Sequence, residues 1–147
     1  MLVGEVEKMV FELALTDFPR GKIPRTTAQQ KRYNSRTNCF FDSDKLSAAR
    51  FYYNSRFCRR RVEMHLGEPL ADPVRLTVVF NYKAPRKKDI GKPKPTRPDC
   101  DNAVKLIQDC LMSAGILKDD SQIYDLRVAK FWAVSESVFV RVEVFEE

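Results

Sequence analysis

The chain of 147 residues contains one histidine, His65, and four cysteines that form no CxxC pair. Zinc sites of the mixed Cys/His type need paired ligands at short spacing, so the sequence excludes them. A Ser-His-Asp or Cys-His mechanism would depend on His65 alone, and we interpret this residue as structural. Any chemistry must then come from carboxylates, lysines and a bound ion.

Long apolar runs and nucleotide-binding glycine motifs are also missing. The longest uninterrupted apolar run has four residues, Phe131 to Val134, which is far too short to span a bilayer. No GxGxxG or P-loop pattern occurs, so a Rossmann or ATPase function has no support. The start of the chain lacks the features of a secretory signal. We expect a cytoplasmic protein with reduced cysteines, no membrane partner and no organic small-molecule cofactor.

The composition is typical of one soluble folded domain, with 44% hydrophobic and 31% charged residues. Alternating and helical spacings of apolar residues predict four strands and two main helices. We therefore predict a single mixed α/β (α+β) domain over residues 1–147. Asp101 is expected to cap the second helix, and Gly67 and Gly115 are expected to close the two helices. The expected strands cover residues 6–15, 74–83, 123–132 and 138–144, and the expected helices cover 43–66 and 101–114.

The net charge of +6 is concentrated in two segments. Residues 19–41 contain six basic and no acidic residues, and residues 83–98 contain seven basic residues and one acid, Asp89. Their prolines, glycines and polar residues predict loops. Clustered Lys and Arg favour a contact with nucleic-acid phosphates over a merely solubilising insertion. The candidate contact residues are Arg25, Lys31, Arg32, Lys83, Arg86, Lys87, Lys88, Lys92, Lys94 and Arg97.

Carboxylates follow directly on the second basic segment, although they repel phosphates. Asp99 and Asp101 are separated by one residue, so in an extended chain they point to the same side. Lys105 lies four residues beyond Asp101, on the same helix face. A divalent cation between the acids reverses the repulsion, and oxygen ligands without His or Cys indicate Mg²⁺ or Mn²⁺. The alternative is a helix-capping Asp with an ordinary ion pair between Asp101 and Lys105.

A second acidic pair, Asp119-Asp120, is the candidate for a third metal ligand. The preceding helix of some 14 residues is about 20 Å long. Six extended residues also span about 20 Å, so the chain returns to the start of the helix only if nearly straight. Otherwise the acidic pair approaches from another direction, for example from a partner subunit. The alternative is a polar turn before a strand.

Together these residues resemble the RusA-type Holliday junction resolvases. The resemblance implies that Asp99, Asp101 and Asp120 are metal-binding catalytic carboxylates, with Asp119 as the adjacent acid. It implies that Lys105 is the catalytic lysine and that Lys130 contacts DNA. It further implies Mg²⁺, with Mn²⁺ as the second choice, a homodimer acting on four-way junctions, and a phage or prophage protein in the cytoplasm of a bacterial host. The motif residues are Arg97-Pro98-Asp99-Cys100-Asp101-Asn102, Lys105, Asp109, Gly115, Asp119-Asp120-Ser121-Gln122 and Lys130.

The sequence thus predicts a Mg²⁺-dependent endonuclease that resolves Holliday junctions by paired phosphodiester hydrolysis in recombination and repair. Two alternatives stay open. One is a non-catalytic branched-DNA-binding protein on the same fold, for which the basic loops alone would suffice. The other is a nuclease for flapped DNA or RNA, because phosphate and metal contacts do not read base identity and hardly read branch structure.

Overall fold

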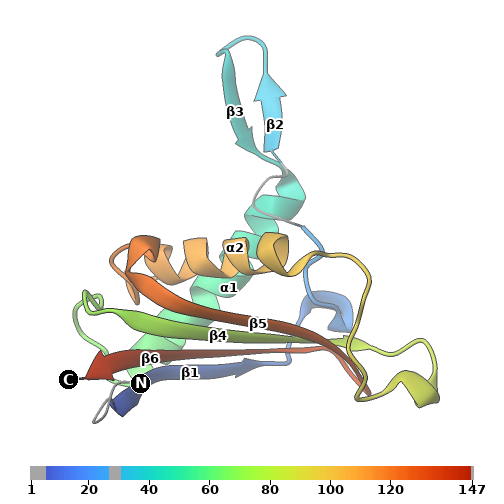
Figure 1. Ribbon diagram of the computed structural model, residues 1–147. Helices are drawn as coiled ribbons and strands as arrows, with labels where there is room; N and C mark the ends of the chain where they lie inside the picture. Colours follow the sequence, from blue (N-terminus) through green and yellow to red (C-terminus); the bar gives the residue numbers. More distant parts are fainter. Residues whose placement is uncertain (1–5, 27–30, 147) are drawn as a thin grey trace.

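The computed structural model describes residues 6–26 and 31–146. Two long helices cover one face of a four-stranded sheet, and a two-stranded hairpin stands away from this body (Figure 1). The predicted mixed α/β fold is confirmed, with all four expected strands and both expected helices in place. In chain order the elements are β1 (Val6–Leu15), η1 (Pro19–Gly21), β2 (Lys31–Asn34), β3 (Cys39–Asp42), α1 (Asp44–Glu63), β4 (Val74–Lys83), η2 (Lys87–Asp89), α2 (Cys100–Ser113), η3 (Asp120–Gln122), β5 (Ile123–Ala133) and β6 (Ser137–Glu146).

The sheet has the strand order β1-β6-β4-β5. β1 and β4 both pair antiparallel with β6, whereas β4 and β5 are parallel neighbours. Parallel neighbours need a crossover connection, and α2 provides it by running back over the sheet (Figure 1). The carboxyl ends of β4 and β5 therefore lie at the same end of the molecule as the beginning of α2.

The core lies between the sheet and the helices. Alternate residues of β4 and β6 face the helices, as their period of two predicts. The helix stripe of Val104, Ile107, Leu111 and Ala114 is buried against them, as predicted. Each fully buried aliphatic side chain contributes about 1.5–3 kcal/mol. The strand residues are Val74, Leu76, Val78, Phe80 and Tyr82 on β4 and Val138, Val140, Val142 and Val144 on β6.

The end of α1 differs from the prediction. The helix stops at Glu63, and His65, not Gly67, takes the left-handed conformation with φ 57°. The backbone N–H of Leu66 donates to the carbonyl oxygen of Arg61 (3.0 Å), the six-to-one bond of a Schellman motif. His65 is thus structural, and the expected closure by Gly67 is wrong. Within the described ranges, neither α1 nor any other helix is long and apolar enough to cross a membrane.

The start of α2 is also shifted by one residue. Asp99, with φ −68° and ψ 148°, is the N-cap, and helical geometry begins at Cys100. The predicted cap, Asp101, lies inside the first turn. The Asp99 side chain accepts no capping hydrogen bond, so its carboxylate is not used by the helix. At the other end, Gly115 closes the helix with φ 75°, as expected.

Residues 19–41 are not one loop, because they contain η1 and most of the β2–β3 hairpin. The rings of Tyr33 and Phe40 pack across this hairpin at a centroid distance of 5.2 Å. The Asn34 side chain accepts a hydrogen bond from the backbone N–H two residues on (2.9 Å), and Asn38 has φ 57°. These are the side chains that tight turns favour. The hairpin is an element that the polar composition of the segment concealed.

Candidate active site and nucleic-acid interface

Asp99 and Asp101 lie together at the exposed start of α2, beside the carboxyl ends of β4 and β5. Within the part of the chain that the structure describes, no Lys or Arg forms an ion pair with either acid, and Lys105 is no exception. The alternative of a capping Asp with an i,i+4 ion pair therefore does not describe this turn. Two carboxylates stand free on it, with the exposed Lys105 one helical turn further on.

Two lysines hold the backbone that precedes this acidic turn. The ammonium of Lys130, on β5, donates to the carbonyl oxygens of Thr96 (2.6 Å) and Pro98 (2.7 Å). The ammonium of Lys94 donates to the hydroxyl of Thr96 (2.7 Å), to its carbonyl oxygen (3.0 Å) and to the carbonyl of Arg97. Charge-assisted bonds of this kind are about twice as strong as neutral ones. The position of the turn is thus set by β5 and by the loop itself.

This use of the two lysines was not expected from the sequence. Lys94 is only 7% exposed, and burial, followed by the nearby charges of Lys130 and Arg25, lowers the pKa of its ammonium. The Lys94 ammonium faces the protein interior, and its DNA contact stays a prediction. The ammonium of Lys130 donates to backbone carbonyls, and its DNA contact stays a prediction.

A buried carboxylate joins the two basic segments. Glu136 is 8% exposed and accepts hydrogen bonds from the backbone N–H groups of Ile23 (2.8 Å) and Lys83 (3.1 Å) and from the guanidinium of Arg25 (3.1 Å). Arg25 also lies over the ring of Tyr82, 4.6 Å from its centroid. Burial raises the pKa of Tyr82 to about 12. Glu136 thereby brings the first basic segment to the carboxyl end of β4. Nothing in its local sequence signals this role.

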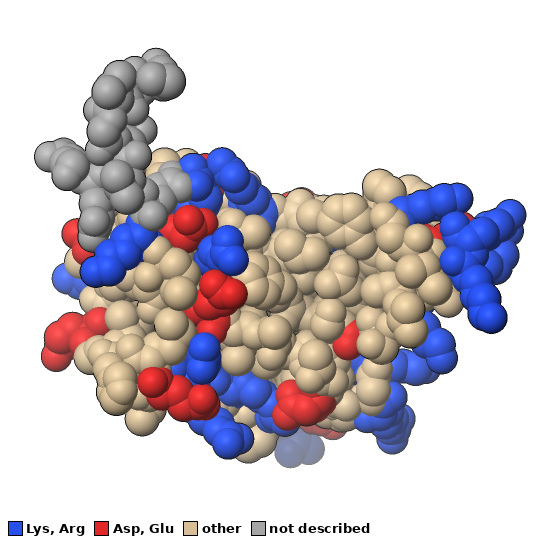
Figure 2. All heavy atoms as spheres, turned by 90° about the horizontal axis from the view of Figure 1, so that it is seen from below, with Lys and Arg blue, Asp and Glu red and all other residues tan. Residues whose placement is uncertain are grey.

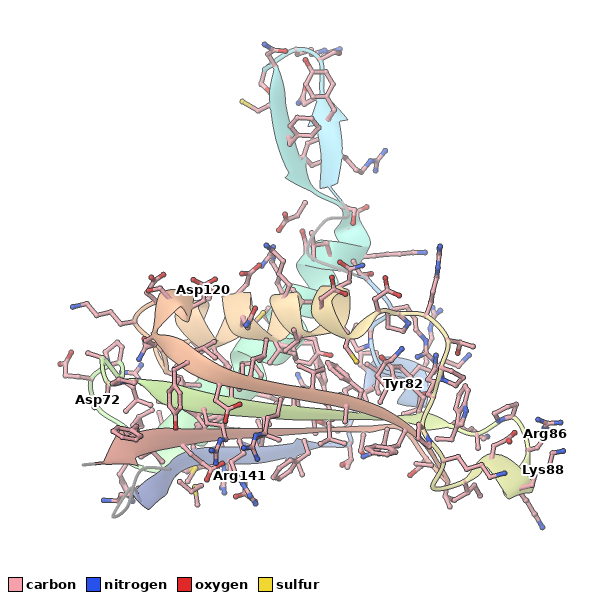
Figure 3. The ribbon with its side chains drawn as sticks, in the orientation of Figure 1. Asp72, Tyr82, Arg86, Lys88, Asp120 and Arg141 are labelled. Carbon is pink, nitrogen blue, oxygen red and sulfur yellow. The ribbon has the colours of Figure 1, made fainter. Side chains whose placement is uncertain are left out.

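The second basic segment projects beyond the sheet as a loop that includes η2, in agreement with its prediction. Arg86 forms an ion pair within the loop with Asp89 (3.0 Å), while Lys87, Lys88 and Lys92 are exposed. Figure 3 shows Arg86 and Lys88 at the tip of this projection, and Figure 2 shows basic side chains gathered at the same end of the molecule. This tip is an exposed basic surface at the end of the molecule where α2 begins (Figure 1).

The β2–β3 hairpin adds a second exposed surface. Arg32 is exposed, and the side chain of Lys31 lies outside the described part of the chain. Large apolar side chains are exposed as well, with Tyr33 at 52% and Phe40 at 72%. A projecting hairpin that combines cations and aromatic rings has the composition of a single-strand nucleic-acid contact.

The two acids of the second pair are used differently. Asp119 caps η3, where it accepts a hydrogen bond from the Ser121 hydroxyl, and this bond lowers the pKa of Asp119. The Gln122 side chain accepts from the backbone N–H of Asp119 (2.9 Å) and donates to the carbonyl of Leu70 (2.9 Å). The polar-turn interpretation thus holds for Asp119. Asp120 is exposed beside it.

Asp120 does not lie with Asp99 and Asp101 in the same chain. η3 follows α2, and Figure 3 shows Asp120 near the end of the helix that is opposite to the acidic turn. A helix of 14 residues is about 21 Å long. Across residues 6–26 and 31–146, no three His, Cys, Asp or Glu side chains are grouped closely enough to hold a metal ion. One chain therefore presents two of the three predicted carboxylates on one turn, and the third lies elsewhere.

Comparison with known proteins assigns the chain to a protein family. The sequence pattern of the family described as Endodeoxyribonuclease RusA matches residues 22–143. The match covers most of the chain, including the acidic turn, Lys94 and Lys130, Glu136 and Asp120. The chain belongs to the RusA endodeoxyribonuclease family, and the resemblance inferred from its motif is confirmed.

Two curated proteins are similar over part of their length. The chain is 40% identical over 58 residues to "Crossover junction endodeoxyribonuclease rusA" of Lactococcus phage r1t, a match that covers 40% of this chain and 44% of that protein. It is 39% identical over 71 residues to "Uncharacterized protein YqaN" of Bacillus subtilis (strain 168), covering 48% and 49% respectively. The chain thus spans about half the length of the curated relatives it matches.

Proposed function

We propose that the protein is a Mg²⁺-dependent endonuclease, with Mn²⁺ as the second choice of ion, that resolves four-way DNA junctions by paired phosphodiester hydrolysis. The supporting observation is that Asp99 and Asp101 stand unpaired on one exposed turn between two basic segments. Two like charges 4 Å apart cost about 4 kcal/mol at an effective dielectric of 20, and a phosphate would add to this repulsion. A cation between the acids removes the conflict. We assign this activity to DNA recombination and repair in the cytoplasm of a bacterial host.

Each side chain of the site then has a separate task. Asp99 and Asp101 hold the ion, which when bound supplies an activated water and neutralises charge on the phosphate. Lys105 places a second positive charge on the scissile phosphate. Lys94 and Lys130 keep the backbone before Asp99 in one position through the five hydrogen bonds described above.

The third carboxylate of each site comes from a second copy of the chain. Asp120 lies at the opposite end of α2 from Asp101, so two chains related by a two-fold axis can exchange these ends. Such a homodimer contains two identical sites, which suits incision of two opposed strands. The incomplete site of the single chain supports this arrangement.

The activity is tested on a synthetic mobile four-way junction and a matching linear duplex, in Mg²⁺, Mn²⁺ and EDTA. We expect paired symmetrical nicks on the junction that disappear in EDTA. Asp101→Asn should reduce the rate about 10²–10³-fold, since metal binding supplies several kcal/mol. Asp72→Asn, which removes an exposed carboxylate elsewhere, is the matched control and should cleave normally. Unchanged cleavage by Asp101→Asn would refute the metal assignment.

The two alternatives are outcomes of the same assay. Salt-sensitive junction binding without incision in either ion would identify a non-catalytic branched-DNA-binding protein. Faster cleavage of flapped DNA or RNA than of the junction would identify a nuclease of another specificity.

Subunit mixing tests the origin of Asp120. Asp101→Asn and Asp120→Asn proteins are inactive alone under the proposal. Their heterodimer contains one intact site if Asp120 acts across the dimer, and it should nick one strand of the junction. If Asp120 acts within its own chain, every site in the mixture is defective and no activity returns.

A further inference from the structure

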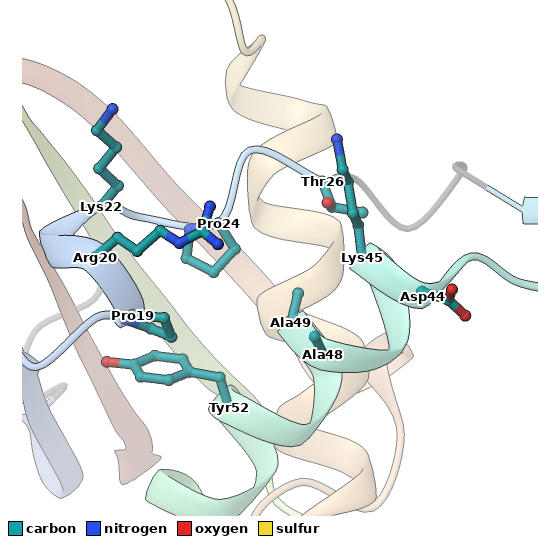
Figure 4. Close-up of a pocket in the computed structure, with 10 residues that line it drawn as sticks. All are labelled: Pro19, Arg20, Lys22, Pro24, Thr26, Asp44, Lys45, Ala48, Ala49 and Tyr52. Atoms are coloured by element: carbon teal, nitrogen blue, oxygen red, sulfur yellow. The ribbon is translucent and has the colours of Figure 1, made fainter.

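A cavity of about 530 Å³ opens between the first basic segment and the N-terminal half of α1 (Figure 4). Its apolar lining includes Pro19, Pro24, Ala48 and Ala49. The volume falls within the ~300–1,000 Å³ of pockets that hold small-molecule ligands. None of the residues predicted for catalysis lines it, so it is distinct from the acidic turn.

Three cations surround this cavity. Arg20, Lys22 and Lys45 all line it, and within the described part of the chain none of them forms an ion pair. Asp44 also lines it, but Figure 4 shows its carboxylate pointing away from the basic side chains. Three uncompensated positive charges around an apolar floor favour a ligand that carries both a phosphate and a ring.

The backbone of Arg20 supports a function for its side chain. Arg20 has φ 58° and ψ 21°, a left-handed conformation that glycine adopts without strain and arginine does not. Figure 4 shows its side chain extending towards Pro24, over the cavity. Local strain of this kind is tolerated where a side chain must hold one position.

The cavity adjoins the acidic turn. Pro24 and Thr26 line it and also line a smaller cavity, which is bordered by Pro98, just before α2, and by Ala103 of its first turn. A strand that leaves the acidic turn and crosses this segment would therefore arrive at the cationic cavity.

We infer that this cavity binds one unpaired nucleotide of the DNA strand, with its phosphate among Arg20, Lys22 and Lys45 and its base on the apolar floor. The inference rests on the proposed function for the identity of the polyanion. A phosphate alone would not use the floor, and a base in a duplex could not enter because its faces are stacked. The cavity would thus read an unpaired position next to the cleavage site.

The test is fluorescence anisotropy with a labelled thymidine oligonucleotide and an abasic oligonucleotide of equal length, both in EDTA. Arg20→Gly removes the cation and fits the left-handed backbone, so the melting temperature should stay equal or rise. Its affinity for the thymidine oligonucleotide should fall about tenfold, and the salt dependence of binding should weaken by about 0.7 in log–log slope. Lys8→Ala, which removes one exposed cation near the opposite end of β1, is the control and should bind normally.

A second variant separates the floor from the charges. Ala48 is exposed on α1, so Ala48→Gln should fold normally while filling the cavity. It should weaken binding of the thymidine oligonucleotide and leave the abasic one unchanged. Equal affinity of the wild-type protein for both oligonucleotides, or normal binding by Arg20→Gly, would overturn the nucleotide site. Asp101→Asn should bind at least as tightly as the wild type in EDTA, because it removes a carboxylate that repels phosphate, so a failure of the catalytic proposal would appear in cleavage and not here.

Discussion

The ammonium of Lys130 lies 2.7 Å from the carbonyl oxygen of Pro98, although 32 residues separate them in the chain. This bond connects β5 to the backbone immediately before Asp99. It means that a turn carrying two free carboxylates is positioned by a strand of the central sheet. Sites supported in this way hold their geometry better than sites on unsupported loops.

Removal of this ammonium should affect both stability and catalysis. Lys130→Met leaves the carbonyl of Pro98 without a donor and that of Thr96 with Lys94 alone, and an unsatisfied acceptor costs about 1–3 kcal/mol. We expect urea unfolding to show a loss of that order and cleavage to require more Mg²⁺. Lys92→Met, an exposed lysine of the same loop, should change neither quantity. Normal stability combined with weak junction binding would instead establish Lys130 as a DNA contact.

The loop tip should contribute affinity without sequence preference. Lys87 and Lys88 are exposed where the loop projects, so we expect each to neutralise one phosphate. Lys87→Ala with Lys88→Ala should lower the slope of log K against log salt by about 1.8 for duplex arms. A salt titration of junction binding in EDTA measures this slope. A matched loss of two charges outside the loop, Arg59→Ala with Lys118→Ala, should leave most of it in place.

Substitution of Glu136 should lower the free energy of unfolding and should affect both basic segments, because Glu136 joins them. Glu136→Gln weakens three hydrogen bonds, one of them to the partly exposed Arg25 guanidinium, and we expect about 1–3 kcal/mol of destabilisation. Glu143→Gln, which changes a carboxylate on β6, is the comparison and should cost less. Denaturant unfolding of both variants decides the matter. Equal losses would show that Glu136 contributes only its charge.

The fold was predictable where its signals are local. Val138, Val140, Val142 and Val144 alternate within one strand, and the period alone identifies their buried face. The β2–β3 hairpin was not predictable in this way, because strands of four residues are too short to show a period. Its support comes from single pairs such as Tyr33 with Phe40, and only the folded chain displays them.

The site was likewise predictable only where its residues lie close together in the sequence. Asp99 and Asp101 are neighbours in sequence and remain neighbours in space. Lys94 and Lys130 were read as DNA contacts because a charge pattern does not distinguish an ammonium facing solvent from one facing a carbonyl. Asp120 could reach the acidic turn only through a nearly straight connection. That segment is instead hydrogen-bonded to another part of the chain, because the Lys118 N–H donates to the Leu70 carbonyl (3.1 Å).

Stability towards acid should depend on Asp125. The Arg75 guanidinium, 2.7 Å away, lowers the pKa of this carboxyl below its usual value of 3.8, and Arg127 adds to the effect. Because the folded-state pKa is the lower one, the unfolded chain binds the proton first as the pH falls. The stabilisation is therefore complete above about pH 5 and is lost as the pH falls through the lowered pKa. Asp125→Asn should unfold more easily in urea at pH 7 and should lose less stability than the wild type between pH 5 and pH 3. Glu68→Gln, an exposed acid, should follow the wild-type profile, and an Asp125→Asn profile parallel to that of the wild type would show that the Arg75 pair does not contribute to folding.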